Sequence, residues 1–244
     1  MTALAVIPAR WKSTRFPGKP LADIAGRPMI AWVWDQAKKA KTIDRVVLAT
    51  DDDKIADYCR THDMEIVMTS PDHQTGSDRL AEVARKVKAD IYVNVQGDEP
   101  LIQPEAIDAV TQCLIDALKR GIEVSTGYVE KAEDNELDNP SVGHLVPTVD
   151  GCVMAMSRLP IPYPMAETMQ RTRHVGLYAF TGAALQRYAN WERGPVERAE
   201  SIELLRFLEH GERVACVPVP PGSIGVDHPA DAERVAAIIR ARQK

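Results

Sequence analysis

The cationic side chains of Arg10, Arg15 and Lys19 lie within ten residues near the start of the chain. They directly follow an apolar run, residues 3–7, that predicts a first β-strand. Prolines and a glycine interrupt the segment and exclude a regular helix, so we expect a shaped loop. Loops at the carboxyl ends of strands are where α/β sheets place ligands. Because Arg grips phosphate oxygens bidentately and Lys adds a point charge, the loop predicts a polyphosphate site, with a solvated basic turn as the alternative.

Neither of the common phosphate-binding motifs is present. The loop lacks the order G-x-x-x-x-G-K-[ST] of a Walker A motif, and no G-x-G-x-x-G follows the strand. Neither Ser13 nor any of the four cysteines has a histidine at the spacing of a nucleophilic site. The residue pattern therefore gives no sign of a Ser or Cys nucleophile, and the cations of the loop suit electrostatic stabilisation.

A second motif, V-N-V-Q-G-D-E-P, occupies residues 93–100. A strand is expected to end at Gly97, so Asp98 should project at the same sheet edge as the cationic loop. A carboxylate beside a triphosphate is repulsive unless it holds a cation, and Mg²⁺ prefers oxygen ligands. The motif therefore predicts a magnesium ligand, and an acidic turn before a helix is the alternative.

The elements that must position these residues alternate along the first half of the chain. Short apolar runs are followed by segments with helical periodicity, which predicts parallel strands with crossover helices, the doubly wound α/β class. The first of these strands is residues 3–7, and Ser77 or Asp78 is the expected N-cap of the third helix. The other expected strands are 45–50, 65–68 and 90–95, and the expected helices are 29–40, 54–61, 77–88 and 104–119.

After about residue 122 the pattern changes. Strand-like runs follow one another without long helices between them, which predicts a small mixed or antiparallel extension inserted into the α/β sheet. A continuous helix is expected over 196–210, then a strand over 214–219 and a last helix from 229. The strand-like runs of the extension are 123–129, 142–149, 152–156 and 175–180.

Composition indicates one globular enzyme domain. The chain has 244 residues, 27.0 kDa and a formal net charge of -5, which argues against a nucleic-acid partner. No apolar run approaches the roughly 18 residues that cross a bilayer, and the amino end lacks the pattern of a secretory signal, so we expect no membrane partner. Widely spaced cysteines are typical of reduced, buried thiols in a cytoplasmic protein.

The segment Ile7–Pro20 resembles the signature I-P-A-R-x-x-S-x-R-x-P-x-K-P of the cytidylyltransferases that activate 3-deoxy-manno-octulosonate (Kdo), the CMP-Kdo synthetases. The related sialic-acid enzymes usually continue into Lys-Asn instead. The resemblance extends to about residue 234 and implies a single nucleotidyltransferase domain over 1–244, Rossmann-like (GT-A-like), with a mixed sheet flanked by helices. It further implies a CTP-binding half (1–122), a sugar-binding and dimerisation extension (123–195) and a return to the main domain (196–244).

For the nucleotide side, the resemblance implies catalytic roles for Arg10, Arg15, Lys19 and Asp98. The sequence G-V-D at residues 225–227 resembles a family motif that implies Asp227 as the second Mg²⁺ ligand, with helix capping by Asp227 or His228 as the alternative. Asp231 falls inside the final helix and is the weaker candidate. Arg79 is the candidate for the nucleotide's phosphate or base beside a helix N-terminus, or else a surface arginine paired with Asp78 or Glu82. The implied CTP-binding residues are Pro8, Ala9, Arg10, Ser13, Arg15, Lys19, Arg79 and Gln96.

For the acceptor side, R-H-x-G-x-Y-x-[YF] at 173–180 resembles the strand whose His and Tyr face the sugar. In the segment 195–206, Glu200 and Glu203 should share one helix face, so that one binds sugar hydroxyls. Arg158 is the candidate for the sugar's carboxylate. The implied sugar-binding residues are Gln96, Arg158, His174, Tyr178 and Glu203.

The resemblance implies that the anomeric hydroxyl of the sugar attacks the α-phosphorus of CTP, releasing pyrophosphate for lipopolysaccharide or capsule synthesis. It also implies a cytoplasmic homodimer. Two positions depart from the family pattern, His144 for Lys and Leu204 for Gln, and we expect them to alter the acceptor pocket. The alternatives are therefore a modified Kdo, a nonulosonic acid or a phosphonate acceptor, and, in another class, a non-catalytic nucleotide-binding regulator.

Overall fold

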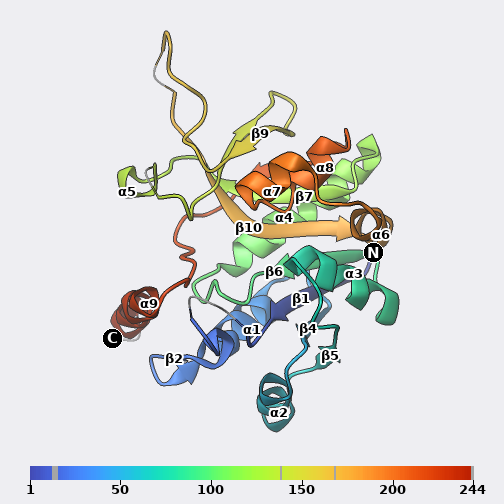
Figure 1. Cartoon of the computed structure of the whole chain (residues 1–244), viewed down its shortest axis with the longest axis vertical. Coiled ribbons are helices and arrows are strands. Elements are labelled where there is room, and N and C mark those ends of the chain that lie inside the picture. Colours follow the sequence, from blue (N-terminus) through green and yellow to red (C-terminus); the bar gives the residue numbers. More distant parts are fainter. Residues whose placement is uncertain (13–15, 138, 168, 243–244) are drawn as a thin grey trace.

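A seven-stranded sheet runs through the centre of the molecule, with helices on both faces (Figure 1). The computed structural model describes residues 1–12, 16–137, 139–167 and 169–242. The strand order is β11-β7-β10-β6-β1-β4-β5. Their bounds are β1 (Ala3–Ala9), β4 (Arg45–Thr50), β5 (Ile66–Met68), β6 (Ile91–Val95), β7 (Val124–Val129), β10 (Arg173–Thr181) and β11 (Ala215–Pro218).

The first half of the chain folds as predicted. Strands β1, β4, β5 and β6 are all parallel, because each pair is joined by a helical crossover. Strand β10 then runs antiparallel to both β6 and β7, while β11 is parallel to β7. The sheet is therefore mixed. The helices of this half are α1 (Met29–Lys39), α2 (Asp53–Thr61), α3 (Gly76–Lys86) and α4 (Pro104–Ala117).

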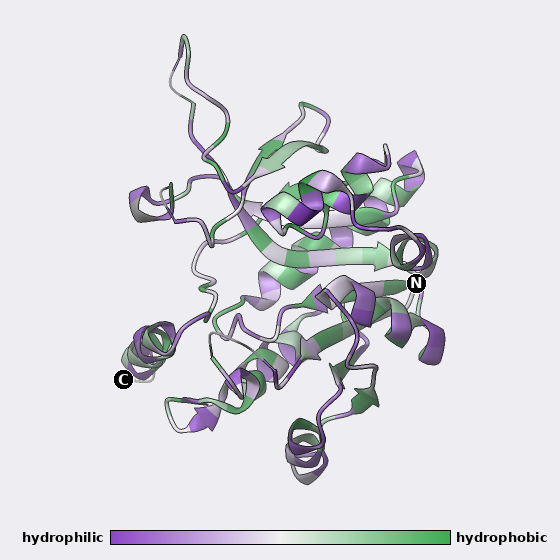
Figure 2. Ribbon diagram, in the orientation of Figure 1, coloured by the Kyte–Doolittle hydropathy of each residue, from purple (hydrophilic) through white to green (hydrophobic). Residues whose placement is uncertain are grey.

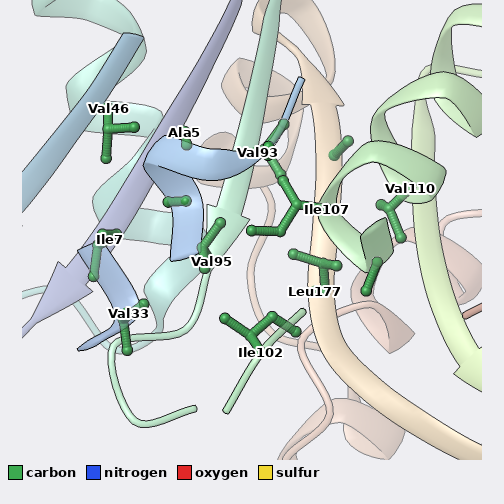
Figure 3. Close-up of a cluster of buried hydrophobic side chains, with 14 of the residues drawn as sticks. Ala5, Ile7, Val33, Val46, Val93, Val95, Ile102, Ile107, Val110 and Leu177 are labelled. Carbon is green, nitrogen blue, oxygen red and sulfur yellow. The ribbon is translucent and has the colours of Figure 1, made fainter. Parts of the chain in front are cut away.

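Alternate residues of β1 pack into two separate parts of the core. Ala5 and Ile7 pack with α1 and α4 on one face (Figure 3), whereas Leu4 and Val6 pack with α3 on the other. A strand buried on both faces needs a continuous apolar run, which is what residues 3–7 provide. Figure 2 shows the apolar colouring concentrated along these central strands.

The expected small antiparallel extension is present. Strands β8 (His144–Pro147) and β9 (Val153–Ser157) form a separate two-stranded antiparallel sheet, and the segment between β9 and β10 projects away from the rest of the molecule (Figure 1). The remaining short elements are β2 (Asp23–Ile24), β3 (Arg27–Pro28), the 3₁₀ turns η1 (Lys19–Leu21) and η2 (Leu118–Arg120), and α5 (Asp134–Leu137). The last helices are α6 (Gly182–Asn190) and α9 (Pro229–Arg242).

The predicted continuous helix over 196–210 is wrong. Helix α7 (Pro195–Glu200) ends at Ser201, which adopts a left-handed conformation with φ 52°, and α8 (Leu205–Glu209) follows after a turn. The break lets Glu197 and Arg206 meet, with Nε 2.7 Å from Oε2. In an unbroken helix these two residues would lie about 13.5 Å apart along the axis. A buried ion pair therefore outweighs the local helical periodicity.

All four cysteines are free thiols, as expected. Burial raises the pKa of Cys59 and Cys113 to about 11 and that of Cys216 to about 12, so these thiols stay protonated and unreactive at neutral pH. Within the described parts of the chain, no helix combines the length and the apolar character that a membrane span requires.

Replacing Arg206 should strongly destabilise the fold. Arg206 and Glu197 are 3% and 1% exposed, so Arg206→Leu leaves Glu197 buried without this partner. The loss should be about 3–5 kcal/mol in the free energy of unfolding, measured by urea denaturation. The control is Arg60→Ala, which removes an exposed pair with Asp57 and should cost no more than about 0.5 kcal/mol. Equal effects of the two variants would contradict a stabilising role for the buried pair.

Candidate active site

The loops that follow β1 and β6 meet at one edge of the sheet because the two strands are parallel neighbours. The contact is very close at Gly97, where a Cβ atom would lie 2.6 Å from the carbonyl oxygen of Pro8. Only glycine allows this approach. It brings Asp98 alongside the cationic loop, as the two motifs predicted.

Lys19 joins three segments that are far apart in the sequence. Its Nζ donates to Asp98 Oδ2 (2.7 Å) and to the carbonyl oxygen of Val226 (2.8 Å), and it lies 3.6 Å from Asp227 Oδ1. The amide of Val226 in turn donates to the carbonyl oxygen of Asp98 (2.9 Å). At the start of α9, the amides of Asp227 and His228 both donate to Asp231 Oδ2. Asp231, in the first turn of α9, therefore binds the two amides that precede the helix, and helix capping by Asp227 or His228 stays a prediction.

Two adjoining cavities open around these residues. We call them the loop-side cavity, about 420 Å³, and the extension-side cavity, about 590 Å³. Six residues line both: Gln96, Asp98, Arg158, Ser201, Glu203 and Asp227. Of the other predicted residues, Pro8, Ala9, Arg10, Lys19 and Arg79 line the loop-side cavity, and His174 and Tyr178 line the extension-side cavity. Ser13 and Arg15 lie outside the described residues.

Asp98 and Asp227 suit a magnesium ion that a phosphate ligand completes. Their side chains are 34% and 29% exposed at the junction of the two cavities, and both lie near one ammonium group. Among the described residues, no group of three or more His, Cys, Asp or Glu side chains is placed to hold a metal. Mg²⁺ is usually bound by one or two carboxylates together with water and substrate phosphates, so the donor set fits.

Arg79 is not the surface arginine of the alternative prediction. It is 4% exposed, and its NH2 group donates to Asp51 Oδ1 at 2.8 Å rather than to Asp78 or Glu82. Burial lowers its pKa, and Asp51 opposes that shift. The charge of Arg79 is therefore already balanced within the protein, and its role in nucleotide binding stays a prediction.

The N-terminus of α3 is occupied by protein groups, which corrects two expectations. Thr75, not Ser77 or Asp78, is the N-cap, and it forms a reciprocal capping box with Asp78. The amides of Gly76 and Ser77 donate to Glu203 Oε1 and Oε2, each at 3.0 Å. A carboxylate from the far end of the chain therefore takes the place expected for phosphate.

Glu200 and Glu203 do not share a helix face, because α7 ends between them. Glu200 accepts hydrogen bonds from Ser157 Oγ (2.8 Å) and from the amide of Arg158 (2.7 Å). Burial raises the pKa of Glu203, which lines both cavities. The two carboxylates thus hold different segments, and sugar binding by Glu203 stays a prediction.

His174 is a neutral imidazole in a defined tautomer. Thr126 Oγ1 donates to the carbonyl oxygen of Leu177 (3.0 Å) and therefore accepts from His174 Nε2 (3.0 Å). The ring stacks on Tyr178 with centroids 5.6 Å apart. Burial, helped by Arg158 and Arg173, lowers the pKa of His174 to about 3. The remaining nitrogen, Nδ1, is consequently an acceptor beside the extension-side cavity.

Arg158 borders both cavities and is held by backbone carbonyl groups. Its guanidinium donates to the carbonyl oxygens of Ser141, Glu200 and Ser201. Within the described ranges of the chain, no carboxylate forms an ion pair with it. Its position and charge leave it suited to an anionic ligand.

The expected alteration of the acceptor pocket is wrong for both departing positions. His144 and Leu204 have 0% exposed side chains, and neither lines either cavity. His144 Nδ1 donates to the carbonyl oxygen of Thr172 (2.8 Å), and Leu204 belongs to the core on the α3 side of the sheet. Their side chains therefore do not face an acceptor, because the turn between α7 and α8 directs Leu204 inward.

Comparison with known proteins agrees with this geometry. A family model described as cytidylyltransferase matches residues 4–214. A 3-deoxy-manno-octulosonate cytidylyltransferase from Aliivibrio fischeri is 41% identical over 98% of this chain and 99% of its own. One from Anaeromyxobacter sp. (strain K) is 43% identical over 97% of each chain. The chain belongs to the 3-deoxy-manno-octulosonate cytidylyltransferase family.

Solved structures agree with this family assignment. A structure described as CMP:2-keto-3-deoxy-manno-octonic acid synthetase complexed with CTP is 38% identical and matches with a TM-score of 0.93, covering 99% of this chain and 100% of its own. A 4-diphosphocytidyl-2C-methyl-D-erythritol synthase from Anaerococcus prevotii is 16% identical, with a TM-score of 0.63 over 98% of both chains. The second likeness supports the nucleotidyltransferase fold alone.

The family motifs did not reveal every residue of the loop-side cavity. Arg193, which precedes α7, lines it and donates from Nε to Glu197 Oε1 (3.1 Å). The i, i+4 spacing of this pair predicts their contact but not the cavity beside them. His73 also lines it, with Nε2 2.5 Å from Glu82 Oε2. The order of residues gives no signal that Arg193 lines the cavity, since the cavity wall comes from α3, α7 and their loops together. His73 belongs to the stretch D-H-x-[ST]-G-[ST]-[DE]-R at 72–79, which resembles the family pattern but does not reveal the contact of His73 with Glu82.

His174 should remain uncharged across the working pH range. An unfolded histidine has a pKa near 6.5, whereas burial lowers that of His174 to about 3. Between these values the unfolded chain binds the additional proton, so this residue makes the protein less stable as pH falls from about 6.5 towards 3. NMR of the imidazole resonances should show no titration of His174 from pH 8 to 5. A midpoint above pH 6 would contradict the buried, neutral assignment.

Proposed function

We propose that this protein transfers a cytidylyl group from CTP to an acidic 3-deoxy keto-sugar, Kdo or a close relative, and releases pyrophosphate. The observation that carries the proposal is the convergence of Lys19, Asp98 and Asp227 at the junction of two cavities. The full-length likeness to a CMP-sugar synthetase solved with CTP supports the choice of nucleotide.

The reaction needs charge stabilisation more than a protein nucleophile. The anomeric hydroxyl of the sugar attacks the α-phosphorus in line, the bond to the β-phosphate oxygen breaks, and negative charge builds on the departing pyrophosphate. Arg10 and Lys19 border the cavity in which that charge would develop. Fixed cations in such a site lower the barrier without reorganising during the step.

The proposed cofactor is Mg²⁺, with Asp98 and Asp227 as its protein ligands. When bound, it would act as a Lewis acid toward the phosphate oxygens and neutralise part of their charge. In the structure, Lys19 lies between the two carboxylates and reduces their mutual repulsion. Arrival of a cation and a polyphosphate would leave Lys19 able to turn toward the leaving group.

The extension-side cavity is the proposed acceptor site. Arg158 would pair with the sugar's carboxylate, since its guanidinium borders the cavity and contacts only backbone oxygens among its hydrogen-bond partners in the described chain. The neutral ring of His174 and the hydroxyl of Tyr178 supply polar groups for sugar hydroxyls. Gln96 lines both cavities and could therefore contact both substrates.

We also propose a homodimer formed through the segment between β9 and β10. This segment projects from the body of the molecule (Figure 1), and Leu159, Tyr163, Met165 and Met169 on it are between 49% and 87% exposed. An apolar cluster of this kind, exposed on a projecting arm, is typical of a protein–protein contact. Sedimentation equilibrium of a dimer would give a molecular mass twice the 27.0 kDa of one chain.

We propose that the protein acts in the cytoplasm. Its product would supply activated sugar for the synthesis of lipopolysaccharide or capsule. Free thiols suit a reducing compartment, and CTP is a cytoplasmic nucleotide.

Pyrophosphate release tests the proposed function. The enzyme is assayed with each of the four nucleoside triphosphates against Kdo, a modified Kdo, a nonulosonic acid and a phosphonate. We expect turnover with CTP and with Kdo or its near relative. Turnover only with a nine-carbon or phosphonate acceptor would contradict the assignment of Kdo as the acceptor. Binding of CTP without any turnover would indicate a regulator.

Loss of either proposed metal ligand should remove most activity. Asp98→Asn and Asp227→Asn each delete a charged oxygen ligand, which should lower kcat by about a hundredfold or more and raise the Mg²⁺ requirement. Calorimetric titration of Mg²⁺ in the presence of CTP should show weakened binding in both variants. The control Asp116→Asn changes an exposed carboxylate on α4 and should behave as wild type. Near-normal rates in both site variants would exclude this metal site.

A further inference from the structure

The aromatic ring of Trp11 packs on the turn that carries Lys19. A Cβ atom placed on Gly18 would lie 3.0 Å from Cη2 and 3.1 Å from Cζ2 of the indole, so the ring rests directly on the glycine backbone. The amide of Gly18 also donates to the carbonyl oxygen of Trp11 (3.1 Å). Both the ring and the backbone of Trp11 therefore hold Gly18.

The backbone conformation of Gly18 determines the position and direction from which the side chain of Lys19 extends. Gly18 has φ 68° and ψ 14°, and its carbonyl oxygen accepts from the amide of Leu21 (2.9 Å) to start the turn η1. Glycine reaches this left-handed region easily but also leaves it easily, because no Cβ restricts it. A neighbouring group must select the conformation. The indole is the group in contact.

Lys54 also contacts the indole. Its Nζ lies 4.4 Å from the centroid of the Trp11 ring, within the range of a cation–π interaction. Lys54 lies in the first turn of α2, where its amide donates to the N-cap Asp52 (2.9 Å), and α2 is anchored in the core by the fully buried Ile55. The ring is thus fixed to a rigid helix as well as to the core beneath it.

We propose that Trp11 is a positioning residue for Lys19. Lys54 fixes the indole over Gly18, and the indole fixes the turn from which Lys19 reaches Asp98 and Asp227. The inference rests on the proposed function, because there Lys19 is assigned to the leaving pyrophosphate. Trp11 itself touches neither substrate in this scheme and acts through the placement of one ammonium group.

The test separates binding of CTP from binding of the acceptor. Trp11→Leu removes the aromatic face and should lower kcat/KM for CTP about tenfold or more, since small misplacements of reacting groups cost up to about a hundredfold. KM for the acceptor should stay within about twofold. Trp11→Phe keeps a ring over Gly18 and should recover most of the loss. A role in folding alone would lower the active fraction without changing either KM.

Lys54→Met keeps the proposal testable if Trp11→Leu fails to fold, because Lys54 is an exposed side chain. It removes the cation but keeps the apolar stem, and should lower kcat/KM for CTP about two- to fivefold. The matched control is Lys12→Met, which removes an exposed cation from the same loop and should behave as wild type. Equal losses in the two lysine variants would overturn the inference, because the effect would then be general charge.

Calorimetric titration with CTP and Mg²⁺ distinguishes failure of this inference from failure of the proposed function. A wild-type protein that makes no CMP-sugar contradicts the proposed function. Even then, the CTP affinities of the wild type and the variants, measured without an acceptor, decide whether the inference holds. Affinities that fall with Trp11→Leu and Lys54→Met and recover with Trp11→Phe support it, and unchanged affinities in all the variants overturn it.

Discussion

The close approach of Gly97 to the Pro8 carbonyl oxygen is the constraint on which the site depends. It places the loops of two neighbouring parallel strands in direct contact, so that a cationic loop and an acidic turn share one point. Lys19 then lies between Asp98 and Asp227 and reduces the repulsion of two carboxylates. One ammonium group offsets only part of the charge of two carboxylates, so the arrangement keeps negative charge that suits a divalent cation arriving with a polyphosphate.

A second constraint joins the carboxyl-terminal part of the chain to the loop-side cavity. The start of α3 forms one wall of the loop-side cavity, and three side chains from beyond residue 185 hold it. Glu203 accepts from the amides of Gly76 and Ser77, Arg206 pairs with Asp78, and Tyr188 contacts the hydroxyl of Thr75. This wall of the loop-side cavity is therefore built from segments far apart in the sequence, so a substitution near α8 that moves these side chains would also move the wall.

The proposed acceptor cavity would have to recognise an anionic sugar next to two carboxylates. Arg158 would meet this need because backbone carbonyl groups orient it without cancelling its charge. His174 contributes hydrogen bonding without charge, since burial keeps its pKa near 3. Separating a fixed cation from neutral polar groups in this way would favour a carboxylate at one end of the ligand and hydroxyls along the rest.

The sequence by itself determined the parallel half of the sheet and the meeting of Lys19 with Asp98, because apolar period, turn residues and strand ends are local properties that point to one sheet edge. The family resemblance added Asp227 to this site, and the structure places it there. The sequence also predicted free thiols and the small antiparallel extension. Only the tertiary structure decided what depends on distant partners. Glu197 and Arg206 break a periodic helix, Asp51 neutralises Arg79, and Glu203 occupies the amides expected to bind phosphate. Burial likewise removes His144 and Leu204 from the pocket, since residue spacing does not report which face the rest of the chain will cover.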